Sequence, residues 1–109
     1  MGSLEGKDCV PCRGGVPPMI EADSQNLLGQ INEEWSLIEN HHIERTWGFD
    51  NFEDALEFVN SAGRICEDEG HHADFELGWG RVKVIIWTHK INGLTESDFI
   101  LAAKLDLLD

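Results

Sequence analysis

Five histidines are the residues of this chain best suited to chemistry, because an imidazole can donate and accept protons near neutral pH. They stand as two adjacent pairs and one single residue: His41, His42, His71, His72 and His89. Two or three imidazoles that meet in the folded chain could supply both an acid and a base. Such proton transfer accelerates a reaction by roughly 10²–10⁴, which corresponds to about 3–5 kcal/mol of barrier.

The segment between His72 and His89 determines whether these histidines meet. It contains two stretches in which apolar residues alternate with other side chains, separated by Gly80-Arg81. This pattern predicts a β-hairpin that turns at Gly80-Arg81, places His72 opposite His89 and leaves His71 next to them.

Three interpretations of this cluster remain open. It could transfer protons, with Glu67 one helical turn before His71 and able to orient an imidazole. The same histidines could be exposed polar residues at strand ends. A zinc site is less favoured, because side chains of adjacent residues diverge and do not form the usual spaced ligand pair. The pair His41-His42 falls in the turn of an earlier hairpin, where solvated residues are expected, and receives no catalytic role.

Aromatic residues and one aspartate are further candidates. Phe75, Trp79 and Trp87 could form a wall on which a flat heteroaromatic ligand stacks, or they could pack in the sheet or a subunit interface. Asp98 is the fourth residue of Thr95-Glu96-Ser97-Asp98, which has the pattern of a helix capping box. That structural role is sufficient to explain Asp98 by itself.

The elements that must position these residues can be read from apolar spacing. Ser24 is expected to cap a short first helix, and Asp50 to open a helix of about four turns that ends at Gly70. Thr95 is expected to open the last helix. With a first hairpin that turns at residues 39–41, the order becomes α-β-β-α-β-β-α. This predicts an α+β fold, a four-stranded antiparallel sheet with three helices packed on one face.

Residues 1–20 differ from the rest and predict an N-terminal arm, followed by one domain over 21–109. The arm contains Cys9-Val10-Pro11-Cys12. A redox motif of this type should follow a strand and open a helix, whereas glycines and prolines follow here. A structural zinc site would need two further ligands. We therefore expect Cys9 and Cys12 to be a pair of free thiols. Cys66 lies on the apolar face of the predicted long helix and is expected in the hydrophobic core.

Composition excludes several classes of partner. The chain has 109 residues, 8 basic and 21 acidic, with a net charge of −13. This excess of acidic residues argues against nucleic acids and anionic membrane surfaces as partners, because proteins bind both through Lys and Arg side chains. We see neither a secretory signal nor an apolar run near the ~20 residues of a membrane span. Three cysteines do not suggest a disulfide framework. A cytoplasmic location is expected.

The motifs together resemble the signature of the pterin-4a-carbinolamine dehydratase family. The matching residues are Glu67-x-x-x-His71-His72-Ala73-Asp74, Trp79, Trp87-Thr88-His89 and Gly93-Leu94-Thr95-x-x-Asp98. The resemblance extends from about Trp35 to Ala103, and the predicted element order is similar to the family's fold. One departure is Ala73, where the best-known members have proline; the exchange removes no proton-transfer group.

The resemblance implies an enzyme that dehydrates 4a-hydroxytetrahydropterin (4a-carbinolamine) to quinonoid dihydropterin in tetrahydrobiopterin recycling. It implies a pterin substrate, no metal or other cofactor, and a homodimer or homotetramer. Acid–base work would fall to His71 and His89, while His72 would chiefly bind or polarise the pterin. The implied catalytic residues are His71, His72 and His89, and the implied substrate-binding residues are Glu67, Trp79 and Asp98.

A second class of function is compatible with the same resemblance. Relatives in the family also act as non-catalytic dimerisation or assembly cofactors, often with the histidine set eroded. All three histidines are present here, which favours the enzyme. The sequence does not distinguish between pterins, and another one such as molybdopterin remains possible as substrate.

Overall fold

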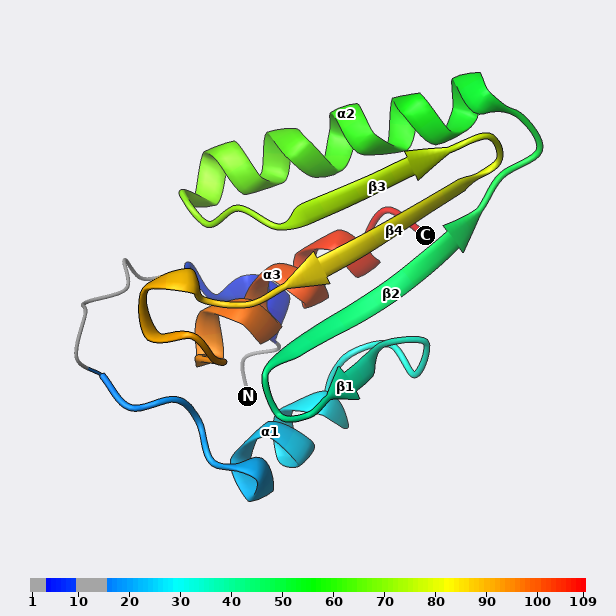
Figure 1. The fold of residues 1–109 in the computed structure, drawn as a ribbon. Helices are drawn as coiled ribbons and strands as arrows, with labels where there is room; N and C mark the ends of the chain where they lie inside the picture. The colour runs from blue at the N-terminus through cyan, green and yellow to red at the C-terminus, as the bar shows by residue number, and fades with distance from the viewer. Residues whose placement is uncertain (1–3, 10–15) are drawn as a thin grey trace.

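The structure is a computed structural model that describes residues 4–9 and 16–109. Its helices and strands follow the predicted order α-β-β-α-β-β-α and confirm the α+β class (Figure 1). The helices are α1 (Glu21–Leu28), α2 (Phe52–Glu69) and α3 (Glu96–Asp106), and the strands are β1 (Ser36–Ile38), β2 (His42–Gly48), β3 (Asp74–Gly78) and β4 (Arg81–Ile86). Two short 3₁₀ turns are η1 (Leu4–Gly6) and η2 (His89–Ile91).

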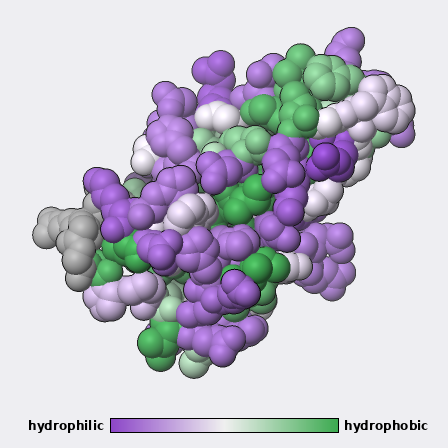
Figure 2. Space-filling view, viewed as in Figure 1, coloured by the Kyte–Doolittle hydropathy of each residue, from purple (hydrophilic) through white to green (hydrophobic). Residues whose placement is uncertain are grey.

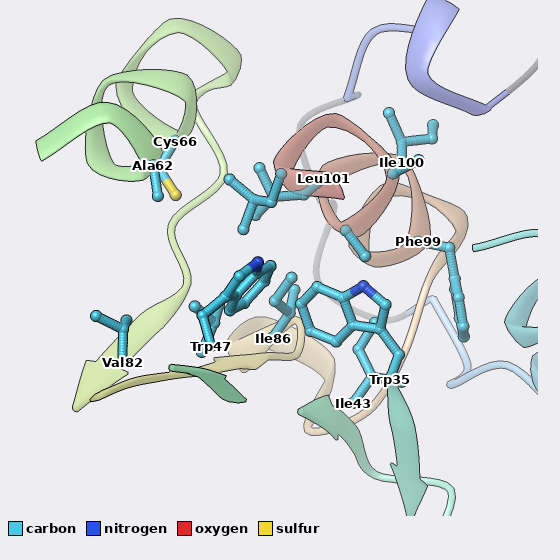
Figure 3. Packing of buried hydrophobic residues seen from close by; sticks show 14 of the residues in the cluster. Trp35, Ile43, Trp47, Ala62, Cys66, Val82, Ile86, Phe99, Ile100 and Leu101 are labelled. Atoms are coloured by element: carbon cyan, nitrogen blue, oxygen red, sulfur yellow. The ribbon is translucent and has the colours of Figure 1, made fainter. Parts of the chain in front are cut away.

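The four strands form one antiparallel sheet in the order β1-β2-β4-β3. Every second residue of the central strands faces the core, as the pleat requires. The buried residues on this face are Ile43, Arg45 and Trp47 of β2 and Val82, Val84 and Ile86 of β4. Helices α2 and α3 cover this face (Figure 3), and α1 packs beside β1 and α3. Among the described residues, no helix covers the other face of the sheet.

Helix α2 sits where the apolar spacing predicted it. It buries Ala55, Phe58, Ala62 and Cys66, which recur every three or four residues. The predicted end at Gly70 is confirmed, with Gly70 at φ 65° in the left-handed region. The cap differs by one residue, because the Oδ1 of Asn51 and not of Asp50 accepts from the backbone N–H of Asp54 at 2.7 Å.

Two further details of the prediction are wrong. Ser24 does not cap α1 but lies buried inside it, and the helix follows Ile20, which makes no side-chain cap. The second hairpin turns at Trp79-Gly80 and not at Gly80-Arg81. Gly80 lies at φ 71°, the position of a two-residue turn that needs a positive φ.

The shifted turn changes the register of β3 and β4. Asp74 pairs with Ile85, whereas a turn at Gly80-Arg81 would pair it with Trp87. The observed register therefore differs from the predicted one by two residues along β4. His72 therefore does not stand opposite His89. Instead His89 opens η2, beyond the end of β4.

The first described residues pack on the domain. Leu4 is only 4% exposed and belongs to the hydrophobic core. The Lys104 Nζ donates to the Glu5 carbonyl at 3.0 Å, and the Cys9 backbone N–H donates to Glu69 Oε1 at 2.9 Å. Residues 4–9 thus cross α3 and the end of α2. Cys12, the other residue of the C-x-x-C pattern, lies outside the described residues.

Hydrophilic side chains cover most of the face shown in Figure 2, in agreement with the net charge of −13. In the described part of the chain, no helix is both long and apolar enough to cross a lipid bilayer.

A buried ion pair joins the sheet to the C-terminal end of α3. Arg45 lies on the core face of β2, with Nη1 at 2.5 Å from Asp106 Oδ1 and Nη2 at 2.9 Å from Asp109 Oδ1. The Trp35 Nε1–H donates to Asp106 at 2.8 Å, and the Arg45 guanidinium lies 4.2 Å from the ring centre of Trp47. Since both charges are largely withdrawn from water, each needs the other.

We expect Arg45→Met to lower the free energy of unfolding by about 3 kcal/mol, because it leaves the largely enclosed Asp106 without its cation. Urea unfolding monitored by circular dichroism measures the loss. Arg81→Met is the matched control: Arg81 is exposed on the adjoining strand, and its loss should change stability by less than about 0.5 kcal/mol. Equal effects of the two variants would contradict this account of Arg45.

The environment of Cys9 makes its thiol unreactive. Burial and the neighbouring Glu69 carboxylate raise the pKa of Cys9 to about 12. Conversely, the Cys9 backbone N–H and Lys104 lower the pKa of Glu69. Only a thiolate is a strong nucleophile, so this arrangement does not favour redox use of Cys9.

We expect Cys9 in the native protein to react with iodoacetamide at pH 8 at least roughly a hundredfold more slowly than in urea, where its pKa returns to about 8.5. Peptide mapping by mass spectrometry separates Cys9 from the other cysteines. Glu69→Gln should accelerate the native reaction by removing the carboxylate. A native rate equal to the rate in urea would refute the burial of this thiol.

Candidate active site

The three histidines singled out by the sequence lie in one cleft of about 330 Å³ at the end of β4. His71 and His72 follow the left-handed Gly70 that ends α2, and His89 opens η2 after β4. The residues that line the cleft are Gly70, His71, His72, Asp74, Trp87, Thr88, His89 and Lys90. The histidines meet because two chain reversals converge there, and not through the strand pairing predicted from the sequence.

His71 is held by the carboxylate of Asp98. Its Nε2 lies 2.6 Å from Asp98 Oδ1, and Asp98 is fully buried at the start of α3. The other oxygen, Oδ2, accepts from the Thr95 backbone N–H and from the Thr88 hydroxyl, both at 2.8 Å. Asp98 therefore closes the predicted capping box and orients His71 with the same carboxylate. Since a carboxylate accepts only, Nε2 of His71 carries a proton and Nδ1 is the nitrogen left for proton transfer.

His72 and Glu67 form the second carboxylate–imidazole pair. His72 Nε2 contacts Glu67 Oε2, and both side chains are exposed. The expectation that Glu67 lies close to a histidine agrees with this contact, but its partner is His72 and not His71. The pair lies at the rim of the cleft, where water weakens its attraction.

His89 is the least constrained of the three. Its Nε2 lies 3.8 Å from Asp74 Oδ2, and the side chain is 56% exposed. The ring centre of Trp87 lies 4.2 Å from that of His89, and Trp87 Nε1 lies 3.4 Å from the same Asp74 oxygen. Each histidine of the cleft thus has one carboxylate partner, with burial that decreases from His71 to His89 and His72.

The predicted aromatic wall is only partly assembled. Trp87 lines the cleft. Trp79 does not, because it occupies the β3–β4 turn at the opposite end of the hairpin, where it is 74% exposed. Phe75 is partly buried against the hydrophobic core.

Sequence reasoning missed several residues of this region. Thr88, which holds Asp98, gave no signal, because a threonine between two strand-like residues is ordinary. Asp74 and Lys90 line the cleft and were not singled out as site residues. His41 was assigned to solvent, yet its ring centre lies 4.3 Å from that of Trp87. His41 and Trp87 are far apart in the sequence, so no local pattern could reveal this contact, which depends on the tertiary fold.

Within residues 4–9 and 16–109, no group of three or more His, Cys, Asp or Glu side chains has the geometry to hold a metal ion. The zinc interpretation of the histidine cluster therefore gains no support there. Instead, the imidazole rings of His71 and His89 share a partly enclosed cleft, and the tautomer of His71 is fixed by Asp98.

Comparison with known proteins gives a consistent result. Residues 17–108 match the family model described as pterin 4 alpha carbinolamine dehydratase. Curated relatives named as candidate pterin-4-alpha-carbinolamine dehydratases include one from Halorhodospira halophila, 51% identical over 107 residues (97% of each chain), and one from Rubrobacter xylanophilus, 47% identical over 108 residues (99% of this chain and 100% of the relative). A solved structure of a "transcriptional coactivator/pterin dehydratase" from Brucella melitensis superposes with a TM-score of 0.77 at 27% identity, covering 84% of this chain and 97% of the other.

The hydrogen bonds of Asp98 lead to a prediction for Asp98→Asn. The Thr95 backbone N–H can only donate, so the amide oxygen of the new side chain should turn toward it and leave the amide NH₂ facing His71. The neutral form of His71 should then change from the Nε2–H to the Nδ1–H tautomer. Histidine ¹⁵N chemical shifts report the tautomer directly.

Asp74→Asn provides the control for this experiment. Asp74 is an exposed carboxylate at the same cleft, but its contact is with His89. We expect the tautomer of His71 to stay unchanged in that variant. An unchanged tautomer in Asp98→Asn as well would contradict the assigned hydrogen bonds.

Proposed function

The chain belongs to the pterin 4 alpha carbinolamine dehydratase family, and from this premise we propose that it removes water from a 4a-hydroxytetrahydropterin by histidine acid–base catalysis. The family model and the names of the curated relatives support a dehydratase. The observation that carries the mechanism is the shared cleft of His71 and His89, in which the buried Asp98 orients one imidazole.

The reaction needs one acid and one base. Protonation of the 4a-hydroxyl group allows the C4a–O bond to break, and the oxygen leaves as water. Removal of the N5 proton supplies the electron pair that forms the C4a=N5 double bond of the quinonoid dihydropterin. One proton is given and one is taken, so the protein gains no net proton and no oxidant or reductant is needed. The acid and the base then regain their starting protonation states by proton exchange with water.

His71 and His89 fit these two roles. His71 presents Nδ1 because Asp98 occupies Nε2, and His89 lies on the other chain reversal that forms the cleft. His72, paired with Glu67 at the rim, is suited to bind or polarise the pterin. Asp98 is a positioning residue, since its carboxylate is buried behind His71. Trp79 would require a rearrangement or a second chain to reach the pterin.

The wider context is also part of the proposal. Release of quinonoid dihydropterin would serve tetrahydrobiopterin recycling, in a cytoplasmic enzyme that forms a homodimer or homotetramer. The open sheet face supports an assembly, because it carries the partly exposed Ile85. The pterin is the only small molecule required; neither a metal nor a redox cofactor enters the proposed steps.

We expect His71→Ala and His89→Ala each to lower the rate of dehydration by at least about tenfold, because each removes one proton-transfer group. Stopped-flow loss of the 4a-hydroxytetrahydropterin absorbance measures the rate. Thr46→Ala is the control, since Thr46 is exposed on β2 and does not line the cleft. Circular dichroism verifies that all three variants are folded.

The outcome separates the enzyme from the assembly cofactor. Unchanged rates in both cleft variants would overturn the catalytic assignment of His71 and His89. Failure of the unaltered chain to accelerate the dehydration would favour the non-catalytic alternative.

A further inference from the structure

We propose that His41 is a positioning residue that holds Trp87, and through it His89, in place at the cleft. The inference rests on the function proposed above, because it assigns His41 an effect on the same reaction. His41 does not line the cleft itself. It acts from the β1–β2 turn, which is remote in sequence from the other site residues.

The β1–β2 turn fixes where the His41 ring projects. Glu39 and Asn40 both lie at φ 52°, and the His41 backbone N–H donates to the Ile38 carbonyl at 2.9 Å. Two consecutive residues with positive φ define a tight turn that matches the twist of the two strands. The turn therefore presents His41 toward the η2 loop instead of releasing it to solvent.

The His41 imidazole makes two contacts with the segment that carries His89. Its ring centre lies 4.3 Å from that of Trp87, and its Nε2 lies 2.7 Å from Asn92 Oδ1. Because an amide oxygen only accepts, His41 Nε2 donates this hydrogen bond. Asn92 ends η2 in the left-handed conformation. His41 therefore contacts the segment on both sides of His89, at Trp87 and at Asn92.

Through Met19, the same turn is also linked to the far end of the loop. Asn40 Nδ2 donates to the Met19 carbonyl at 2.9 Å, and the Met19 backbone N–H donates to the Leu94 carbonyl at 2.9 Å. Pro18 lies so close to Gly93 that a Cβ there would stand 2.6 Å from the Pro18 Cβ. The loop is thus braced from the β1–β2 turn and from the segment that precedes α1.

His89 needs such support because its other contacts are weak. The separation of 3.8 Å from Asp74 joins two side chains that are each more than half exposed, and exposed pairs contribute little. Contact with the Trp87 ring is then the main restraint on the His89 side chain. Trp87 is partly buried against the hydrophobic core, and on its other contacts it is held by His41 and by a long 3.4 Å hydrogen bond to Asp74. A catalytic group displaced by 1 Å can cost a reaction about a hundredfold.

Kinetics of three variants test this role. We expect His41→Ala to lower kcat roughly tenfold, with smaller effects on KM and on the melting temperature, because the proton-transfer groups remain but are less well placed. His41→Phe keeps a flat ring against Trp87 and should recover at least about threefold of that loss. Thr46→Ala changes an exposed side chain further along β2 that does not line the cleft, and should leave kcat within about twofold of the unaltered protein.

Nuclear magnetic resonance of the His89 ring provides a readout that does not depend on turnover. The Trp87 ring lies 4.2 Å from the His89 ring and should shift the His89 Cε1–H resonance, so His41→Ala should move this resonance, whereas Thr46→Ala should not. An unmoved His89 resonance together with an unchanged kcat overturns the proposal, as does an equal loss of kcat in Thr46→Ala. If the unaltered chain dehydrates no 4a-hydroxytetrahydropterin, the proposed function fails, and the His89 resonance alone decides the role of His41.

Discussion

The carboxylate of Asp98 is the interaction on which the rest of the site depends. It is fully buried, yet every bond it makes is accounted for: Thr95 N–H and the Thr88 hydroxyl on one oxygen, and the His71 imidazole on the other. A buried carboxylate without such partners would cost several kcal/mol. The start of α3, the loop after β4 and the end of α2 are therefore joined at one group, and the position of His71 is fixed by the fold itself.

Each histidine of the cleft is paired with a carboxylate, and the strength of this attraction depends on how far the pair is buried. His71 is 12% exposed and meets a fully buried partner, so its attraction to Asp98 is little screened by water. The pairs of His72 with Glu67 and of His89 with Asp74 are exposed, and such pairs contribute at most about 1 kcal/mol. One imidazole is thus rigidly oriented, and the other two can adjust to a ligand. Acid and base roles that differ in this way suit a reaction in which one proton is given and another taken.

Most of the architecture could be predicted from the sequence, because apolar spacing and caps are local signals. The capping box of α3 and the end of α2 at Gly70 are examples. The turn of the second hairpin was misplaced by one residue, since Gly80 can serve either turn position and only the observed φ of 71° decides between them. The cleft was predicted for the wrong reason: the histidines converge at chain reversals beyond the strands. Contacts such as Thr88 with Asp98 and His41 with Trp87 join distant segments, and no local pattern encodes them.

The charge of the chain is consistent with a site built in this way. The chain carries a net charge of −13, but each carboxylate next to a cleft histidine is committed to that imidazole: Asp98 to His71, Glu67 to His72 and Asp74 to His89. Matching acids to imidazoles one by one limits the negative field inside the cleft. Many of the other acidic residues are exposed to solvent, where ions screen them within about 10 Å. A small heterocycle without a large charge can therefore enter a strongly acidic protein. The same matching lets each imidazole gain or lose a proton beside its own counter-charge, which is the property that acid–base catalysis requires.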